Sequence, residues 1–302
     1  MRLRPPPTDP APDLDHIDIL ELMATGKRTT TWDAFDTVRR TRCIVKVIRA
    51  HRRGDNEIRT SVIREGVTLQ TLSHPHLVRG YGMFGDAPDA DGPVGFTMQT
   101  VPGATLDVVI DDGCLDAADT VELGLQVSSA LQYLHGHNWI HLDVKPSNII
   151  VHGGQATLID LGLLTRPGER RAGAGTRGYL APEQADGRAL TPAADTFSLG
   201  VTLVESLSGQ RPFGREAVWS SRRRIPLREG RMPRRPAGVP EHLPAGLRDL
   251  LLEMVHLDPA RRPSMCDVWQ RLSSLSKTTT RSAATPDTGQ PASSPAHAKR
   301  RR

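Results

Sequence analysis

Eight residues in the middle of the chain combine side chains that suit phosphoryl transfer. Residues 141–148 place a carboxylate at Asp143, an ammonium at Lys145 and a carboxamide at Asn148. Pro146 prevents a regular helix across them, so the stretch must be a shaped loop. Shortly after it, an apolar run ends in a second carboxylate, Asp160, two residues ahead of a glycine. A base candidate, a cation, an amide oxygen and a second carboxylate are what phosphoryl transfer from a magnesium-bound nucleotide requires.

The elements around this loop change character along the chain. The part before residue 103 predicts short strands and one amphipathic helix, with strands at 19–22, 32–38, 43–48 and 94–101 and the helix at 59–72. The later part has helical periodicity, in particular at 121–134, 197–207 and 247–255. We therefore expect a boundary between two lobes near residue 103, with the loop held between packed apolar segments.

The ordered pattern, rather than any single motif, points to a family. A lone Asp-x-Gly occurs often by chance, whereas His-x-Asp-x-Lys-Pro-x-Asn followed by Asp-x-Gly is specific. It resembles the catalytic and metal loops of eukaryotic-type (Hanks-type) serine/threonine protein kinases, and the form of the motifs resembles their soluble bacterial branch. The resemblance runs from about residue 17 to residue 272. It implies an α+β, two-lobed fold, with a small antiparallel sheet and one helix in the N-lobe and a mainly helical C-lobe.

The resemblance also implies the domain limits. Residues 17–101 would form the N-lobe and residues 102–272 the C-lobe. Residues 1–16 are proline-rich and predict a disordered lead-in. Residues 273–302 are rich in Ser, Thr and Pro with a basic end, and predict a disordered tail.

Catalytic roles follow residue by residue from the same likeness. Asp143 would be the base that accepts the proton of the substrate hydroxyl, and Lys145 would neutralise charge on the transferred phosphoryl group. Asn148 and Asp160 would hold Mg²⁺ through hard oxygen ligands. These assignments make Asp143, Lys145 and Asn148 the expected catalytic residues, and ATP and Mg²⁺ the expected cofactors.

A second set of residues would bind the nucleotide. Lys46, paired with Glu65 on the predicted helix, would contact the phosphates of ATP. The glycine-rich loop of the family would fall on residues 24–31, where Gly26 alone of its glycines survives, and this predicts weakened but not abolished ATP binding. Besides Lys46, Glu65, Gly26 and Asp160, the expected nucleotide-binding residues are Ala24, Thr31, Ile44, Met98, Gln99, Val101 and Ile150.

Residues 175–183 resemble the end of a kinase activation segment. Thr176 there, with Lys145, is typical of serine- and threonine-directed members. Leu142 replaces an arginine that normally binds a phosphate on this segment, so we expect phosphorylation of the segment not to switch activity strongly. Two structural contacts are implied as well: Asp195 with the backbone of the catalytic loop, and Arg262 with Glu183.

Composition limits the cellular setting and the partners. The net charge is +5, and residues 273–302 account for it with six Lys or Arg residues against one acidic residue. The rest of the chain is neutral overall, so the charge supports no nucleic-acid partner beyond the tail. No apolar stretch is long enough to span a membrane, no signal peptide is recognisable, and the three cysteines have no disulfide or zinc spacing. We expect a cytoplasmic protein that binds neither membrane nor nucleic acid.

The functional hypothesis is a serine/threonine protein kinase that transfers the γ-phosphate of ATP to protein hydroxyls, with autophosphorylation at sites such as Thr278–Thr280. The alternative is a nucleotide-binding pseudokinase or scaffold with little turnover, which the eroded glycine loop and Ile44 favour. A small-molecule phosphotransferase would lack the 181–183 segment. The arginine-rich stretch 215–235 suits a docking surface for acidic partners, although a solvated loop is the simpler interpretation. Nothing in the sequence indicates the oligomeric state.

Overall fold

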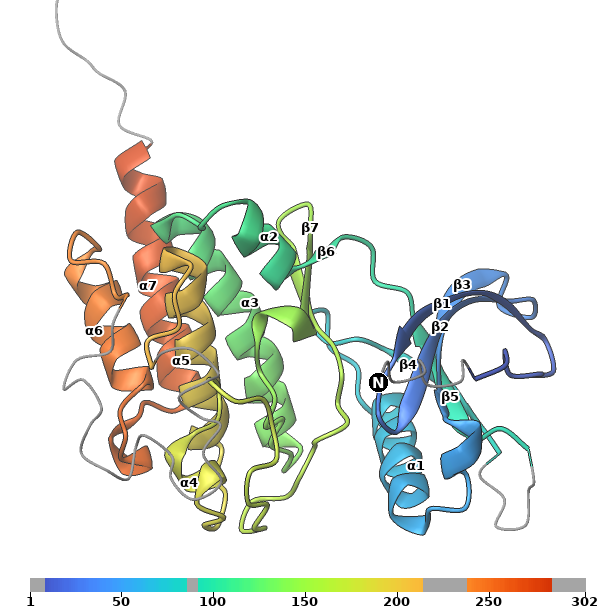
Figure 1. Ribbon diagram of the computed structural model, residues 1–302. Helices are drawn as coiled ribbons and strands as arrows, with labels where there is room; N and C mark the ends of the chain where they lie inside the picture. Colours follow the sequence, from blue (N-terminus) through green and yellow to red (C-terminus); the bar gives the residue numbers. More distant parts are fainter. Residues whose placement is uncertain (1–8, 86–91, 214–237, 284–302) are drawn as a thin grey trace, which may run out of the picture.

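The computed structural model describes residues 9–85, 92–213 and 238–283, with the backbone alone for 278–283. Within these residues the chain forms two lobes, one built on a sheet with a long helix and the other mainly helical (Figure 1). The α+β, two-lobed architecture expected from the sequence is confirmed.

A five-stranded antiparallel sheet forms the N-lobe. Alternating apolar residues give it two buried faces, and one of them buries Trp32, Ala34 and Val45. The other face packs on α1. The strands are β1 (Ile17–Thr25), β2 (Thr29–Asp36), β3 (Thr41–Ile48), β4 (Gly80–Phe84) and β5 (Gly95–Gln99), in the order β1-β2-β3-β5-β4.

Helix α1 (Asn56–Thr71) begins three residues earlier than the apolar periodicity predicts. The reason is its N-cap, because the side chain of Asp55 accepts a hydrogen bond from the amide of Ile58 at 3.2 Å. Gly66 lets the helix approach the sheet closely, since a Cβ atom there would lie 2.9 Å from Cβ of Phe96. This close packing fixes the position of Glu65, the residue that directly precedes Gly66 on the helix.

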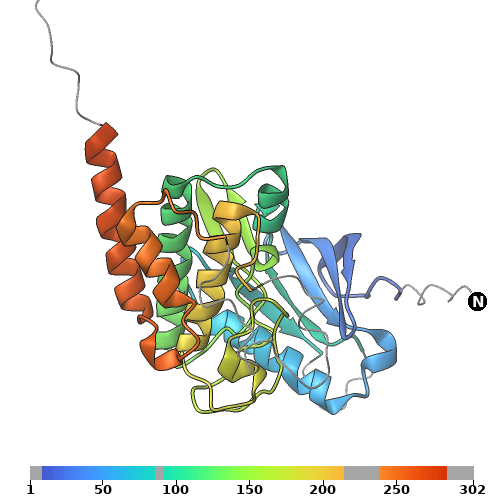
Figure 2. The same ribbon diagram turned by 60° about the vertical axis from the view of Figure 1, so that its left-hand side comes forward.

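The C-lobe surrounds helix α5, most of which is buried. Helices α3 and α7 lie side by side, and α5 packs against α3 and α6 (Figure 2). The elements are β6 (Ala104–Thr105), α2 (Leu106–Asp112), α3 (Ala117–Gly136), β7 (Ile149–His152), β8 (Gln155–Leu158), α4 (Pro182–Ala185), α5 (Ala193–Ser208), α6 (Ala245–Met254) and α7 (Met265–Ala283), with 3₁₀ turns η1 (Ala50–Arg52), η2 (Pro146–Asn148) and η5 (Pro259–Arg261). Strands β6, β7 and β8 form a second antiparallel sheet.

A short backbone pairing joins the two lobes. The segment after α1 runs beside the end of β8, where the amide of Val78 donates to the carbonyl of Leu158 at 3.0 Å and the amide of Leu158 donates to the carbonyl of His76 at 2.9 Å. Asp160 follows Leu158 by two residues. The pairing therefore ties this carboxylate to the N-lobe.

The two ends of the fold differ from the sequence-based limits. Helix α7 continues to Ala283, whereas the sequence placed the tail from residue 273 onward. Leu275 packs against the main core and extends the apolar stripe of the helix by one turn. In the lead-in, the carboxylate of Asp9 accepts from Nε of Arg49 at 2.6 Å and from the amide of Ala50 at 3.1 Å.

Three regions named in the sequence analysis lie outside the described residues: 1–8, the basic stretch 215–235 and the end of the tail, 284–302. The side chains of Thr278–Thr280 also lie outside the described part of the structure. Among the helices of the described ranges, none is both long and apolar enough to cross a membrane.

Candidate active site

A buried carboxylate on α5 holds the backbone of the catalytic loop. Asp195 accepts from the amides of His141 at 2.9 Å and Leu142 at 2.8 Å, and from Nε2 of His135 at 2.8 Å. Burial alone would raise the pKa of Asp195, but these hydrogen bonds, that of His135 first, keep it below its ordinary value. The predicted contact between Asp195 and the loop is confirmed.

The loop backbone is strained where it turns. Leu142 has φ of 67°, a left-handed conformation that costs a residue with a side chain roughly 1–2 kcal/mol. Its amide is bound by Asp195, and its carbonyl accepts from Nε2 of Gln184 at 2.8 Å. Two hydrogen bonds, one on each of the peptide groups that flank the Cα atom of Leu142, therefore hold the turn in place. The loop presents Asp143 directly after this residue.

The carboxylate of Asp143 lies at the centre of a small polar network. Its Oδ2 accepts from Nζ of Lys145 at 2.8 Å and from Nδ2 of Asn148 at 3.0 Å. Its Oδ1 accepts from the hydroxyl of Thr176 at 2.7 Å, and Lys145 also donates to that hydroxyl at 2.6 Å. The hydroxyl of Thr176 thus lies where a substrate hydroxyl could approach the base.

Lys46 joins the two lobes through two carboxylates. From β3 its Nζ donates to Oε1 of Glu65 on α1 at 2.8 Å and to Oδ1 of Asp160 at 2.9 Å. The predicted pairing of Lys46 with Glu65 is confirmed. Asp160 has φ of 62°, so this side chain is also presented from a strained residue.

Lys46, Glu65 and Asp160 shift one another's pKa values. Burial would lower the pKa of Lys46, but Asp160 and Glu65 together raise it above its ordinary value. Lys46 in turn holds the pKa of Asp160 well below its usual range. Burial raises the pKa of Glu65 to about 7, against the opposing effect of Lys46. Near neutral pH the ammonium and the Asp160 carboxylate are charged, and Glu65 titrates.

Two oxygen donors could hold a divalent cation. The Asp160 side chain is 45% exposed and its lowered pKa keeps it ionised. Asn148 directs its amide nitrogen to Asp143, which leaves the amide oxygen on the opposite branch of the side chain. A carboxylate with an amide oxygen fits Mg²⁺, which usually takes few protein ligands together with substrate phosphates.

Register in the N-lobe sheet brings five of the eleven predicted nucleotide-binding residues to one face. Residues directly opposite each other on neighbouring strands point to the same side. Ala24 lies opposite Thr31, Thr31 opposite Lys46, and Ile44 opposite Met98. Ile44 and Lys46 are two residues apart on β3, so their side chains lie on the same side of the sheet. This face carries the Lys46 ammonium that reaches Asp160.

The remaining predicted residues lie at the turn, at the link between the lobes and in the second sheet. Gly26 is in the tight turn between β1 and β2, where its amide donates to the carbonyl of Thr29 at 2.9 Å. Gln99 ends β5, its amide donates to the carbonyl of Arg79 at 2.8 Å, and Val101 follows it. Ile150 lies on β7, opposite Thr105.

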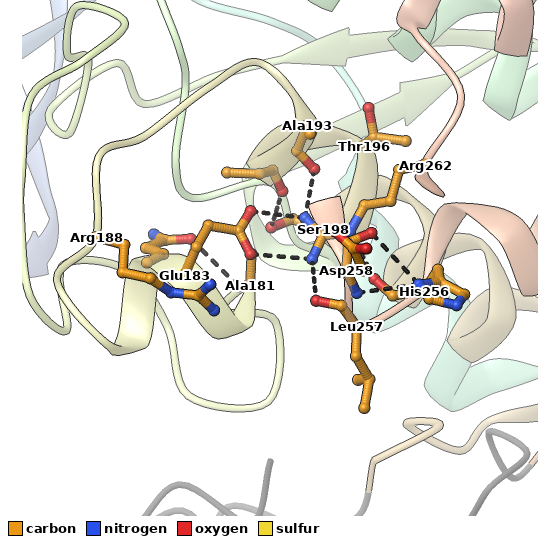
Figure 3. Close-up of polar contacts among 12 residues, drawn as sticks. Ala181, Glu183, Arg188, Ala193, Thr196, Ser198, His256, Leu257, Asp258 and Arg262 are labelled. Atoms are coloured by element: carbon orange, nitrogen blue, oxygen red, sulfur yellow. Dashed lines mark hydrogen bonds and ion pairs between the residues drawn. The ribbon is translucent and has the colours of Figure 1, made fainter. Parts of the chain in front are cut away.

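A bidentate ion pair joins Glu183 on α4 to Arg262, which follows η5 (Figure 3). Arg262 Nη1 and Nη2 donate to Oε1 and Oε2 of Glu183 at 2.7 and 3.0 Å. Its remaining donors reach the carbonyls of Ala193, His256 and Leu257. The Arg262 side chain is fully buried and that of Glu183 is 3% exposed. The predicted pair is confirmed.

Sequence reasoning missed two supporting residues. His135 shares Asp195 with the catalytic loop, and Gln184 binds the carbonyls of Leu142 and Ala174, which ties the loop to the activation segment. His135 lies on the inner side of a regular helix, where the helical pattern gives no sign of a polar partner. Gln184 directly follows Glu183, and this position next to a motif residue could have indicated a structural role.

Comparison with known proteins decides the family. Residues 18–272 match the family described as the protein kinase domain. The chain belongs to this family. PknA of Mycobacterium tuberculosis strain H37Rv, a serine/threonine-protein kinase, is 30% identical over 252 residues, which cover 80% of this chain and 56% of the relative. PrkC of Bacillus subtilis strain 168, also a serine/threonine-protein kinase, is 29% identical over 209 residues, 67% of this chain and 32% of the relative. The chain thus spans about half of the first relative and a third of the second.

Proposed function

We propose that this protein kinase family member is an ATP-dependent serine/threonine protein kinase. One observation carries the proposal above all: an N-lobe ammonium, Lys46, lies within hydrogen-bond distance of Asp160, which follows the C-lobe strand β8. The same region of the C-lobe presents Asp143 and Lys145 as an ion pair at 2.8 Å. This arrangement provides a phosphate contact, a metal ligand and a base around one space.

The proposed roles follow from the contacts. Lys46, oriented by Glu65, binds the phosphates of ATP, and Asp143 accepts the proton of the attacking hydroxyl. Lys145 stabilises the negative charge of the transferred phosphoryl group, which leaves ATP for the substrate oxygen while ADP departs. Asn148 and Asp160 would hold Mg²⁺, which neutralises phosphate charge when bound.

The nucleotide site comprises a larger group of residues in this proposal. The side chains of Ile44 and Met98 would enclose the adenine, and the backbone of Gln99 and Val101 would bind its edge. Ala24 in place of a flexible glycine weakens ATP binding without preventing it. Gly26, Thr31 and Ile150 complete the proposed site.

Serine and threonine specificity rests on Thr176, whose hydroxyl contacts both Asp143 and Lys145. Protein substrates are the proposed partners, and the tail threonines Thr278–Thr280 are the proposed autophosphorylation sites. We propose that the protein acts in the cytoplasm, and the free cysteines Cys43, Cys114 and Cys266 fit a reducing compartment.

Phosphoamino-acid analysis tests this proposal against the pseudokinase alternative. The full chain is incubated with γ-labelled ATP, Mg²⁺ and a generic protein substrate, and the hydrolysed products are separated. We expect labelled phosphoserine and phosphothreonine without phosphotyrosine. The absence of any label in substrate and enzyme would leave the pseudokinase as the better account.

Ionisation of Glu65 predicts a pH dependence of ATP binding. Below pH 7 protonation removes its charge and weakens its hold on Lys46, so KM for ATP should rise by about tenfold between pH 8 and pH 6. The Glu65→Gln variant should have a higher KM at pH 8 and a much flatter profile. Steady-state kinetics at both pH values measures this. An equally steep profile in the variant would assign the titration to another group.

Thr165 should not act as a phosphorylation switch. It is fully buried, its backbone amide and carbonyl both form hydrogen bonds with the backbone of Ile140, and its hydroxyl donates to Glu169. A kinase could not reach that hydroxyl in the folded chain. Thr165→Ala removes one hydrogen bond of about 1 kcal/mol, so kcat should change by less than about tenfold. A hundredfold loss of kcat would contradict this prediction.

A further inference from the structure

The described part of the lead-in, residues 9–16, lies along the outer face of the N-lobe sheet, which is the face opposite α1. Pro12 is buried, and Leu14 packs against the apolar cluster on this face. The carbonyl of His16 accepts from the amide of Thr37 at 2.9 Å and from its hydroxyl at 3.1 Å. The lead-in is therefore fixed to the sheet at the end where it enters β1.

The other end of the described lead-in is fixed at the end of β3. There Oδ2 of Asp9 accepts from Nε of Arg49 at 2.6 Å, and Oδ1 accepts from the amide of Ala50 at 3.1 Å. The side chains of Asp9 and Arg49 are only 10% and 9% exposed, so little water competes for the contact. Charge-assisted hydrogen bonds of this kind are short and strong. Asp9 thus fixes the direction of the Arg49 guanidinium.

Arg49 in turn binds the turn between β1 and β2, where the family has its glycine-rich loop. Nη1 of Arg49 donates to the carbonyl of Gly26 at 3.4 Å, and the amide of Arg49 donates to the carbonyl of Arg28 at 3.0 Å. The amide of Gly26 donates across the turn to the carbonyl of Thr29 at 2.9 Å. Two carbonyls of the turn are therefore held by one residue at the end of β3.

These contacts determine which way the Gly26 peptide group faces. Side chains alternate between the two faces along a strand, so Arg49 lies on the outer face with Val47, and Lys46 lies on the opposite face. The Gly26 carbonyl, which accepts from Arg49, is directed to the outer face. In a trans peptide the N–H of the next residue points the opposite way, so the Lys27 amide is directed to the Lys46 side. Within the described residues this amide donates to no acceptor.

We propose that the lead-in positions the phosphate-binding turn of the nucleotide site, with Asp9 acting through Arg49 and Arg49 acting through the Gly26 peptide. This inference rests on the proposed nucleotide site. An unpaired backbone amide in a turn is a donor for phosphate oxygens, and a turn already held in place loses less conformational entropy when the ligand binds. Gly26 is the one glycine left in this turn. Its backbone is the least restricted there, so a restraint from outside the turn has its largest effect at this residue.

The positioning role predicts which part of the nucleotide depends on the lead-in. The turn would contact the phosphates, whereas the proposed adenine contacts, Ile44 and Met98, belong to β3 and β5. Loss of the Asp9 contact should therefore weaken binding of an ATP analogue and leave binding of adenosine nearly unchanged. A lead-in that only stabilised the N-lobe would affect both ligands alike.

Titration calorimetry of the full chain with Mg²⁺ tests this, using a non-hydrolysable ATP analogue and, separately, adenosine. In Asp9→Asn one carboxylate oxygen becomes an amide nitrogen, so the side chain cannot accept from both Arg49 and Ala50. We expect this variant to bind the analogue about three- to tenfold more weakly and adenosine within about twofold of the unaltered chain. Arg49→Gln should weaken the analogue at least as much. The double variant should bind it no more weakly than Arg49→Gln alone, because Asp9 acts through Arg49.

Asp13→Asn is the matched control. Asp13 is an exposed residue of the same segment and forms no hydrogen bond or ion pair within the described residues, so the variant loses the same charge without a contact. It should bind both ligands as the unaltered chain does. Thermal unfolding shows whether each variant is folded, and if Arg49→Gln is not, the comparison of Asp9→Asn with Asp13→Asn decides the question.

The outcomes separate this inference from the proposed function. Equal affinity of Asp9→Asn and the unaltered chain for the analogue would overturn the positioning role. Parallel losses for the analogue and adenosine, or an equal loss in Asp13→Asn, would also overturn it. An unaltered chain that binds neither ligand would overturn the nucleotide site as well. Because the titrations need no phosphoryl transfer, a chain without kinase activity would give the same result.

Discussion

Replacement of Asp143 by asparagine should lower kcat for phosphoryl transfer by about a hundred- to ten-thousandfold, the usual contribution of a general base. Asparagine has nearly the same shape: its amide oxygen can still accept from Asn148 and its amide nitrogen can donate to the Thr176 hydroxyl, while the proton acceptor is lost. The affinity for ATP should remain within about threefold, because Asp143 is neither the phosphate contact nor the proposed metal ligand. Single-turnover transfer from γ-labelled ATP measures the rate.

The matched control for this variant is Asp112→Asn, which removes the same charge from the exposed end of α2. It should leave kcat unchanged. A full rate in Asp143→Asn would remove the base from the mechanism. Equal losses in both variants would indicate a general effect of charge rather than chemistry at the loop.

The largest effect on stability is expected for Arg262→Met. The variant leaves the Glu183 carboxylate buried without its partner, and breaking a buried pair in this way costs about 3–5 kcal/mol. The double variant with Glu183→Gln should recover part of this loss, because no uncompensated charge remains. Urea unfolding of the three proteins measures the difference.

Arg271 provides the comparison, since its pair with Glu253 is exposed on both sides, at 36% and 48%. Arg271→Met should cost less than about 1 kcal/mol. If Arg262→Met lowered the free energy of unfolding no more than Arg271→Met, the buried pair of Arg262 with Glu183 would not stabilise the fold more than an exposed pair does. A double variant as unstable as Arg262→Met alone would show that lost packing dominates over the buried charge.

The chemistry of the site was readable in the sequence because its groups are local. Asp143, Lys145 and Asn148 lie within six residues, and the strand and helix that carry Lys46 and Glu65 have clear periodicity. The pairing of Lys46 with Asp160 joins residues 114 positions apart. Their proximity could be predicted only from the family resemblance, because no local sequence pattern links residues so far apart.

Contacts without a local pattern were not predictable. Asp9 binds Arg49 across 40 positions from a proline-rich stretch that has no apolar periodicity. His135 reaches Asp195 across 60 positions from within a regular helix. The end of α7 was misplaced for a different reason: its last turns are rich in Ser and Thr, which have modest helix propensity, yet Leu275 still packs on the core.

A cavity lies between α1 and the segment that follows Asp160, and three arginines line it. Arg28, Arg64 and Arg171 are ordinary surface residues by sequence, each far from the others along the chain. Only the fold brings them together around one cavity. Their shared positive charge is therefore a property of the tertiary structure alone.

Binding of a non-hydrolysable ATP analogue, measured by titration calorimetry with Mg²⁺ and with a chelator, tests the central claim most directly. The arrangement of Lys46, Asn148 and Asp160 predicts one binding event per chain, weakened by at least about tenfold when Mg²⁺ is removed. In Asp160→Asn the difference between the two conditions should largely disappear. No uptake of the analogue by the intact chain, or equal affinity with and without Mg²⁺, would contradict the proposed site.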